Sequence, residues 1–182
     1  MLAGDYDGKV EVVNNQRISV PMIHAIWDAL RLASEGKSAK GIREILEAEA
    51  LQSSIYITVA TLKYLKKGGR ISGPASFVGG LLKIKPILHM NSEGKLVPHS
   101  KAAGRKKAID ALIDKMHKHG NGNKFGIVFI SHSGPEEDAI LLKEKIEANF
   151  KVDEILIEHI DPVIAAHVGY GGLALFFESK EK

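Results

Sequence analysis

The sequence feature that most constrains the fold is an apolar run, FGIVFI, which extends from Phe125 to Ile130. A strand without alternating polar residues is typical of a sheet whose two faces are both covered. Predicted helices flank this run. Residues 104–117 carry an apolar stripe opposite charged positions, and residues 133–137, SGPEE, combine a cap residue, a proline and early acids at a helix start. We therefore expect helices packed against a sheet, which defines an α/β fold.

Further short strands are predicted from β-branched or partly alternating apolar residues in segments 55–59, 85–90, 95–97, 152–160 and 172–177. The turn sequence Asn91-Ser92-Glu93-Gly94 separates two of these strands and predicts a hairpin, across which His89 and His99 face each other. The second half of the chain is thus predicted to be an α/β sandwich, in which helices pack against several strands.

The first 70 residues predict a smaller, incomplete unit. Residues 9–13, KVEVV, are predicted to form a buried strand, and two helical patterns follow before the next strand. Trp27 lies on the apolar stripe of the first helix and is predicted to be a core residue. This element order implies parallel pairing with helical crossovers, but two strands do not form a stable sheet. We therefore expect residues 1–70 to be the remnant of a larger parallel-sheet α/β domain, or to dock on something else, and residues 71–182 to form a C-terminal domain.

The stretch Thr61–Pro86, TLKYLKKGGRISGPASFVGGLLKIKP, combines a basic helix end with an apolar, glycine-rich segment. Gly68-Gly69 is predicted to stop the short helix, because glycine adopts the left-handed conformation that a helix C-terminus needs. Arg70 and Ser72 follow at once on backbone that must turn sharply. These features suit a pocket for a molecule with an acidic head and an apolar body. A helix–turn–strand connection with solvated lysines is the alternative.

The charge of the chain is concentrated in its middle. The net charge is +3, but residues 61–120 carry 13 lysines and arginines against 3 acids, whereas the segments before and after are net acidic. Such a distribution suggests an anionic partner, which could be a carboxylate, a phosphate, nucleic acid or an acidic protein surface. A solvated basic surface without a partner is the alternative.

Composition excludes several kinds of site. The chain has no cysteine, so disulfides, thiolate metal sites and cysteine nucleophiles are excluded, and a cytoplasmic location is expected. No apolar run reaches the roughly 20 residues that a membrane-spanning helix needs. The first five residues, MLAGD, lack the basic start and apolar centre of a secretory signal.

Few motifs point to catalysis. His117 and His119 lie at a predicted helix end, where histidine complements the helix dipole, so a metal site there is disfavoured. Ser131-His132-Ser133 follows a buried strand, but no acidic residue or oxyanion motif stands beside it, so a nucleophilic serine is also disfavoured. His167 stands between small apolar residues and a glycine-rich segment. Its imidazole could donate a hydrogen bond to a ligand carboxylate.

Two segments of the chain resemble the signature of the DegV family of fatty-acid-binding proteins. The first is Leu62–Ser72, LKYLKKGGRIS, followed by Leu81–Leu88, LLKIKPIL. The second is Pro162–Gly171, PVIAAHVGYG, which is similar to the family's His-x-Gly-Pro-Gly segment. The order and separation of the segments also fit. The match covers nearly the whole chain, which resembles the later two-thirds of a full-length member.

The resemblance implies a non-enzymatic protein that needs no cofactor. It would hold a fatty acid and present the carboxylate to a partner fatty-acid kinase. The residues implied at the head group are Arg70, Ser72, His167 and Gly169. The implied walls of the acyl cavity are Phe77, Val78, Leu81, Leu82, Ile84 and Ile164. The implied kinase-facing residues are Arg105, Lys106 and Lys107.

The chain also departs from the family pattern. Tyr170 replaces the usual proline, and Ala103 stands where members commonly have an arginine. The family's N-terminal threonine and serine head-group ligands have no counterpart. Two alternatives therefore stay open: a module that binds nucleic acid or an acidic protein through residues 61–120, and a truncated relative that binds no ligand. Aromatic residues make up only 6% of the chain, which argues against single-stranded nucleic acid.

Overall fold

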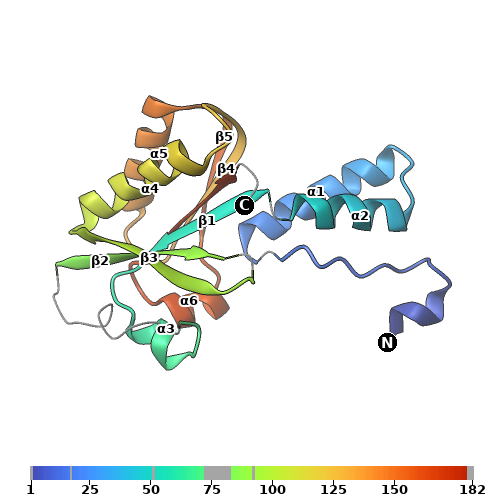
Figure 1. Cartoon of the computed structure of the whole chain (residues 1–182), viewed down its shortest axis with the longest axis horizontal. Coiled ribbons are helices and arrows are strands. Elements are labelled where there is room, and N and C mark those ends of the chain that lie inside the picture. The colour runs from blue at the N-terminus through green and yellow to red at the C-terminus, as the bar shows by residue number, and fades with distance from the viewer. Residues whose placement is uncertain (1, 17, 51, 72–82, 92, 180–182) are drawn as a thin grey trace. The chain divides into compact units, whose positions relative to one another are not determined.

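The computed structural model describes residues 2–16, 18–50, 52–71, 83–91 and 93–179. The chain divides into two compact units, Met1–Gln52 and Ser53–Lys180 (Figure 1). The strand and the helix that follow residue 52 therefore belong to the second unit, although the sequence placed them with the first 70 residues. That the first unit is the remnant of a larger domain stays a prediction. Among the described residues, no helix combines the length and the apolar character needed to cross a membrane.

The second unit is built on one six-stranded mixed sheet with the order β3-β2-β1-β6-β4-β5. Among the described strands, only β4 and β5 pair in parallel, and the other neighbours are antiparallel. The strands are β1 (Ser53–Thr58), β2 (Ile84–Met90), β3 (Leu96–Ala103), β4 (Lys124–His132), β5 (Lys151–His159) and β6 (Leu173–Glu178). The helices are α3 (Lys63–Lys67), α4 (Arg105–His119), α5 (Glu136–Asn149) and α6 (Pro162–Val168).

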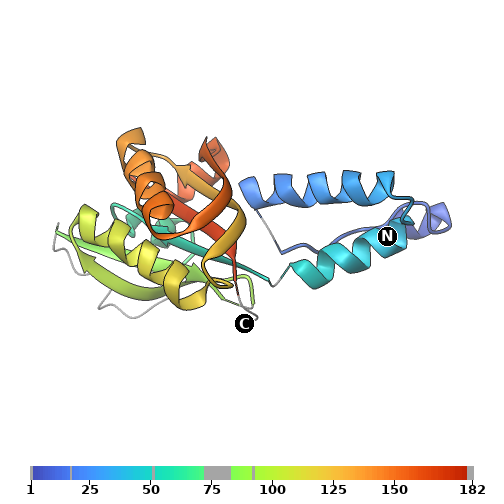
Figure 2. The same cartoon turned by 90° about the horizontal axis from the view of Figure 1, so that it is seen from above.

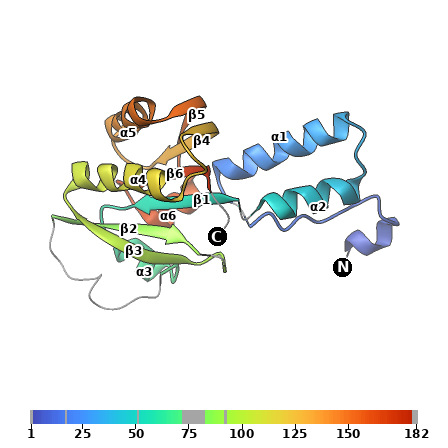
Figure 3. The ribbon, with the colours of Figure 1, turned by 45° about the horizontal axis from the view of Figure 1, so that its top comes forward.

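Helices cover both faces of this sheet. Helices α4 and α5 lie on one face, and α3 and α6 lie on the other (Figures 1 and 3). Strand β4, which lies between β6 and the edge strand β5, carries the FGIVFI run, of which Val128 and Ile130 are fully buried. The main core forms where α4 and α5 meet the sheet, with Ile109, Leu112, Leu142, Ile146 and Leu175 among its members. The predicted α/β fold, with helices packed against several strands, is confirmed.

The β2–β3 hairpin forms where the turn sequence predicted it. The side chain of Asn91 accepts hydrogen bonds from the backbone N–H groups of Glu93 at 3.1 Å and Lys95 at 2.8 Å. Gly94 has a φ of 72°, which few residues other than glycine adopt without strain. The rings of His89 and His99 lie 5.2 Å apart between centroids, so the prediction that they face each other across the hairpin is confirmed.

The first unit contains no strand among its described residues. Its elements are the short 3-10 helix η1 (Leu2–Tyr6) and the helices α1 (Val20–Ser34) and α2 (Ala39–Glu49), which lie side by side in Figure 2. Residues 9–16 belong to no strand, and Glu11 accepts a hydrogen bond from Arg43 of α2 at 2.7 Å. The predicted strand at residues 9–13 is therefore wrong. Its predicted parallel pairing is also wrong, because β1 finds antiparallel partners in β2 and β6.

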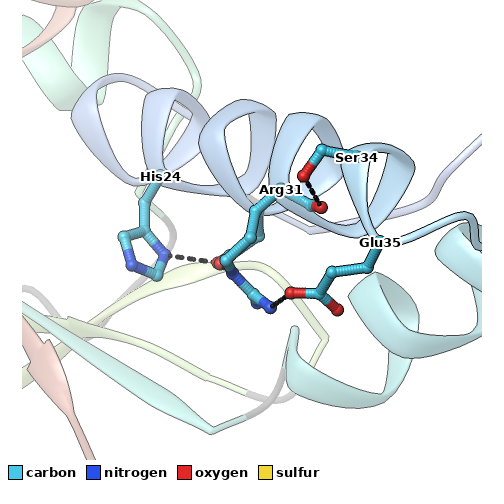
Figure 4. A network of polar contacts seen from close by, with 5 residues as sticks. His24, Arg31, Ser34 and Glu35 are labelled. Carbon is cyan, nitrogen blue, oxygen red and sulfur yellow. Dashed lines mark hydrogen bonds and ion pairs between the residues drawn. The ribbon is translucent and has the colours of Figure 1, made fainter.

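Helix α1 leaves much of its apolar stripe exposed within this unit. Trp27 is 46% exposed and Leu30 is 65% exposed. The prediction that Trp27 is a core residue is wrong for this structure, since α1 packs against α2 and a single helical neighbour buries only part of a helix surface. Polar residues of α1 bond along the helix: Arg31 pairs with Asp28 at 3.0 Å and with Glu35 at 2.9 Å (Figure 4).

Candidate functional site

The Gly-Gly-Arg segment forms the end of helix α3. The backbone N–H of Gly68 donates to the carbonyl of Tyr64 at 2.8 Å, and that of Arg70 donates to the carbonyl of Leu65 at 2.9 Å. Gly69 has a φ of 67°, so it supplies the left-handed residue that ends the helix. Leu65 is 2% exposed and anchors α3. The prediction that the two glycines stop this helix is confirmed.

His167 lies in the last turn of helix α6. The side chain of Asp161 caps the start of this helix by accepting hydrogen bonds from the N–H groups of Val163 at 3.0 Å and Ile164 at 3.1 Å. The helix ends at Gly169, whose φ is 74°. Val168 is 3% exposed and holds the helix end in the fold, while the His167 side chain is half-buried.

Helices α3 and α6 approach each other at two glycines, and they lie side by side in Figure 1. A Cβ atom at residue 68 would overlap the Nδ1 atom of His167 and would lie 3.0 Å from its Cε1 atom. A Cβ atom at residue 169 would overlap the ring of Tyr64. The imidazole of His167 therefore lies directly against the Gly68 backbone, two residues before Arg70. The tertiary structure thus brings together the two segments that the sequence singled out.

Arg70 is exposed, and its Nη1 atom donates to the carbonyl oxygen of Gly68 at 2.9 Å. Gly68 is therefore a shared neighbour of Arg70 and His167. Lys66 and Lys67 occupy the last turn of α3 and are also exposed. These side chains place positive charge at the C-terminal end of α3, where cations are favoured by the helix dipole.

The remaining predicted head-group and acyl-cavity residues fall into two groups, those outside the described residues and those that the structure places. Ser72, Phe77, Val78, Leu81 and Leu82 lie outside the described residues. Ile84, at the start of β2, and Ile164, in α6, are half-buried. The acyl cavity and the head-group roles of these residues stay predictions.

An apolar sheet face lies beneath α3 and α6 and was not predicted from the sequence. Ile57 is paired with Leu88 and with Ala174 across neighbouring strands, so the three side chains point to the same side of the sheet. This side is opposite to that of Ile87 and Leu175, which belong to the core under α4 and α5. All three are buried, and Leu88 is 0% exposed. Apolar residues at alternate positions of these strands indicated that the sheet has a second apolar face. The sequence did not indicate which helices cover that face.

Ser133, which directly follows β4, was considered from the sequence only as a disfavoured nucleophile, and its structural role was missed. Its Oγ atom donates to the carbonyl oxygen of Gly169 at 2.6 Å and accepts from the N–H of Gly172 at 3.0 Å. Its backbone N–H donates to the Gly172 carbonyl at 3.0 Å, and its carbonyl accepts from Gly171 at 3.1 Å. The hydroxyl thus holds the turn that follows His167.

Arg105 contributes to the same turn from the start of α4. Its Nε atom donates to Asp138 of α5 at 2.8 Å, and its Nη1 atom donates to the Gly171 carbonyl at 3.1 Å. The Arg105 side chain is only 22% exposed, whereas Lys106 and Lys107 are fully on the surface. The predicted kinase-facing role of these three residues stays a prediction, and Arg105 is already occupied by contacts within the fold.

The rings of His89, His99 and His119 lie around Tyr56 on the other face of the sheet. The ring of Tyr56 lies 5.7 Å from His99 and 5.8 Å from His119 between centroids. Burial, reinforced by Lys115 and by neighbouring His89 and His119, lowers the pKa of His99 from 6.5 to about 4. Burial also lowers the pKa of His119. Among the described residues, no group of three or more histidine, aspartate or glutamate side chains is arranged to hold a metal ion.

Comparison with known proteins identifies the relatives of this chain. A family model described as an uncharacterised protein of the DegV family matches residues 1–180. A DegV domain-containing protein of Clostridium perfringens is 36% identical over 171 residues, which cover 94% of this chain and 59% of that protein. The chain thus spans about three fifths of the length of this curated relative.

Solved structures of relatives share the fold. A structure described as fatty acid binding of a DegV family protein from Thermus thermophilus has a TM-score of 0.86 at 30% identity, covering 98% of this chain and 64% of that one. A structure of a fatty acid binding DegV family protein from Streptococcus agalactiae has a TM-score of 0.79 at 30% identity, covering 94% of this chain and 60% of that one.

Proposed function

Because this chain belongs to the DegV family, we propose that it is a non-enzymatic protein that binds a long-chain fatty acid, with the carboxylate held near Arg70 and His167. The observation that carries the proposal is the packing of the His167 ring against Gly68, next to Arg70. Fatty-acid binding by the relatives from Thermus thermophilus and Streptococcus agalactiae supports the choice of ligand.

The head group would be bound by charge and hydrogen bonding. A guanidinium offers paired N–H donors that match a carboxylate, and an imidazole N–H donates in both protonation states. The exposed Lys66 and Lys67 add positive charge at the same helix end. This combination selects an anionic head group, and Ser72 and Gly169 are proposed as further contacts.

The acyl chain would be bound by apolar burial. We assign it to the sheet face that carries Ile57, Leu88 and Ala174, under α3 and α6, together with Ile84 and Ile164. Residues Phe77, Val78, Leu81 and Leu82 complete the proposed lining. Each buried methylene contributes about 0.8 kcal/mol, so a long chain would supply most of the affinity while the polar contacts orient the carboxylate.

The proposed role is to present the carboxylate to a separate fatty-acid kinase in the cytoplasm. No cofactor is required, because the protein would change no bond in the ligand. The exposed Lys106 and Lys107, at the start of α4, are proposed to contact the kinase, and Arg105 would act by holding the surface in place through Asp138.

Lipid extraction tests the proposal. The purified protein is extracted with organic solvent, and the extract is analysed by mass spectrometry for fatty acid at close to one molecule per chain. His167→Ala and Arg70→Ala should each lower the retained amount. Lys151→Ala, an exposed lysine at the start of β5, is the matched control and should retain wild-type levels. Unchanged retention in both site variants would contradict the site, and a lipid-free wild-type protein would favour a ligand-incompetent relative.

The basic segment 61–120 gives less support to nucleic-acid binding than its sequence suggests. Arg105 is paired with Asp138, and Lys95 is paired with Glu93 at 2.7 Å. Burial lowers the pKa of Lys115. Binding to random oligonucleotides that weakens steeply with salt would restore this alternative.

A further inference from the structure

The turn Gly169–Gly172 follows His167 and is rich in glycine, so its own residues do not restrict it to one conformation. Gly169 and Gly171 have φ values of 74° and 87°. Glycine enters this region readily, but it also has more alternatives than any other residue. The N–H of Gly169 closes helix α6 by donating to Ala165 at 2.8 Å. Interactions from outside the turn must therefore fix its conformation.

Ser133 supplies four of these interactions. Its hydroxyl bridges both ends of the turn, from the Gly169 carbonyl at 2.6 Å to the Gly172 N–H at 3.0 Å. Its backbone bonds to Gly172 and Gly171 at 3.0 and 3.1 Å. The Ser133 side chain thus pairs the Gly169 carbonyl and the Gly172 N–H. Gly169 lies 36 positions after Ser133 in the sequence.

Neighbouring residues pack closely against Gly171, in the middle of the turn. A Cβ atom at residue 134 would lie 2.7 Å from the Cα of Gly171, and one at residue 171 would lie 3.0 Å from the Cβ of Ala60. Arg105 holds the Gly171 carbonyl at 3.1 Å. The Ser133 hydroxyl bonds to Gly169, the residue that follows α6 two positions after His167, and the Tyr64 ring packs against the same glycine.

We propose that Ser133 is a positioning residue for the fatty-acid site: its hydroxyl fixes the end of α6 and so keeps the His167 imidazole against Gly68, in reach of the ligand carboxylate. This inference rests on the proposed function. Without the hydroxyl, the Gly169 carbonyl and the Gly172 N–H lose their partner, and the last turn of α6 is free to shift. The carboxylate then loses its imidazole contact although His167 itself is intact.

A double-mutant cycle with oleate tests the inference. Ser133→Ala should weaken oleate binding about tenfold, as expected when a buried hydrogen-bonding group loses its partner. In the His167→Ala background, the same change should cause no further loss, because the ring that Ser133 positions is gone. Ser34→Ala removes a hydrogen bond of α1 to the Arg31 carbonyl, and this control should bind as wild type. Equal losses in both backgrounds, or no loss in either, would overturn the role of Ser133.

A second measurement separates this inference from the proposed function. The imidazole nitrogens of His167, observed by long-range proton–nitrogen NMR without ligand, should change their shifts in Ser133→Ala but not in Ser34→Ala. Unchanged His167 signals overturn the positioning role even if oleate binds. A wild-type protein that does not bind oleate overturns the proposed function, and with it the role of Ser133 in a fatty-acid site. Ser133→Cys, which keeps a weaker donor and acceptor, replaces the alanine variant if that variant does not fold.

Discussion

The contact between Gly68 and His167 predicts a strong coupling between two substitutions. Gly68 has φ −78° and ψ −2°, which alanine adopts without strain, and a glycine-to-alanine change at such a position stabilises by about 0.4–1 kcal/mol through the unfolded state. The added Cβ would, however, overlap the Nδ1 atom of His167. Overpacking of this kind costs about 1–3 kcal/mol. Gly68→Ala should therefore be destabilising by about 0.5–2 kcal/mol.

The sign should reverse when the ring is removed. In the His167→Ala background, the added methyl group no longer meets the imidazole and keeps a contact of 3.3 Å with the Tyr64 carbonyl oxygen, so Gly68→Ala should stabilise by up to about 1 kcal/mol. The coupling between the two positions is then about 1–3 kcal/mol, and it lies at the lower end if the ring rotates away. Gly126→Ala is the control, because a Cβ atom there meets open space. Its effect should be the same in both backgrounds.

Urea unfolding followed by far-ultraviolet circular dichroism measures these differences in the free energy of unfolding. Fluorescence is unsuitable because Trp27 is the one tryptophan of the sequence and it lies in the first unit. A coupling free energy below about 0.5 kcal/mol would mean that the effects of the two substitutions simply add, as they do for residues that are not in contact. That result would refute the placement of the His167 ring on Gly68, and the proposed carboxylate site depends on this placement.

Two further predictions concern groups outside the site. The folded pKa of His99, about 4, is below its ordinary 6.5, so protonation favours the unfolded chain; its contribution to stability should be complete above about pH 6.5 and should be lost as the pH falls toward 4. His99→Gln should flatten the decline of the urea midpoint over this range, and an unchanged slope would contradict the assignment. Asp138→Asn should destabilise by about 1 kcal/mol because it weakens a part-buried pair with Arg105. Asp153→Asn, in an exposed pair at 3.7 Å, should change stability by less than about 0.5 kcal/mol in the same assay.

Local chemistry made much of the fold predictable. The apolar run at residues 125–130 predicted the buried strand β4, and the sequence at residues 91–94 predicted the hairpin turn. Gly68-Gly69 predicted the end of α3. In each case the deciding interaction lies within a few residues, as the hydrogen bonds of Asn91 to Glu93 and Lys95 illustrate. Short-range interactions of this kind depend on residue identity alone.

The failures at residues 9–13, Trp27 and Ser133 involve distant partners, whereas helix α6 was not predicted although its Asp161 cap and Pro162 are local signals. Residues 9–13 have the composition of a strand, yet a strand needs a neighbour, and β1 pairs instead with β2 and β6. Trp27 lies on a helical apolar stripe, but its burial depends on how many layers cover α1. The role of Ser133 was invisible because Gly169 and Gly172 are distant along the chain.

The sequence by itself determined the α/β class, the buried strand at residues 125–130, the hairpin turn, the end of α3, and the family signature carried by the Gly-Gly-Arg and His167 segments. Only the tertiary structure decided that these two segments meet at Gly68, that Arg105 and Ser133 hold the turn after His167, and that an apolar sheet face lies beneath α3 and α6. The physical reason is that caps and turns are set by neighbours along the chain. The meeting of α3 with α6 is set by strand order, which brings β1 and β6 together across more than half the chain.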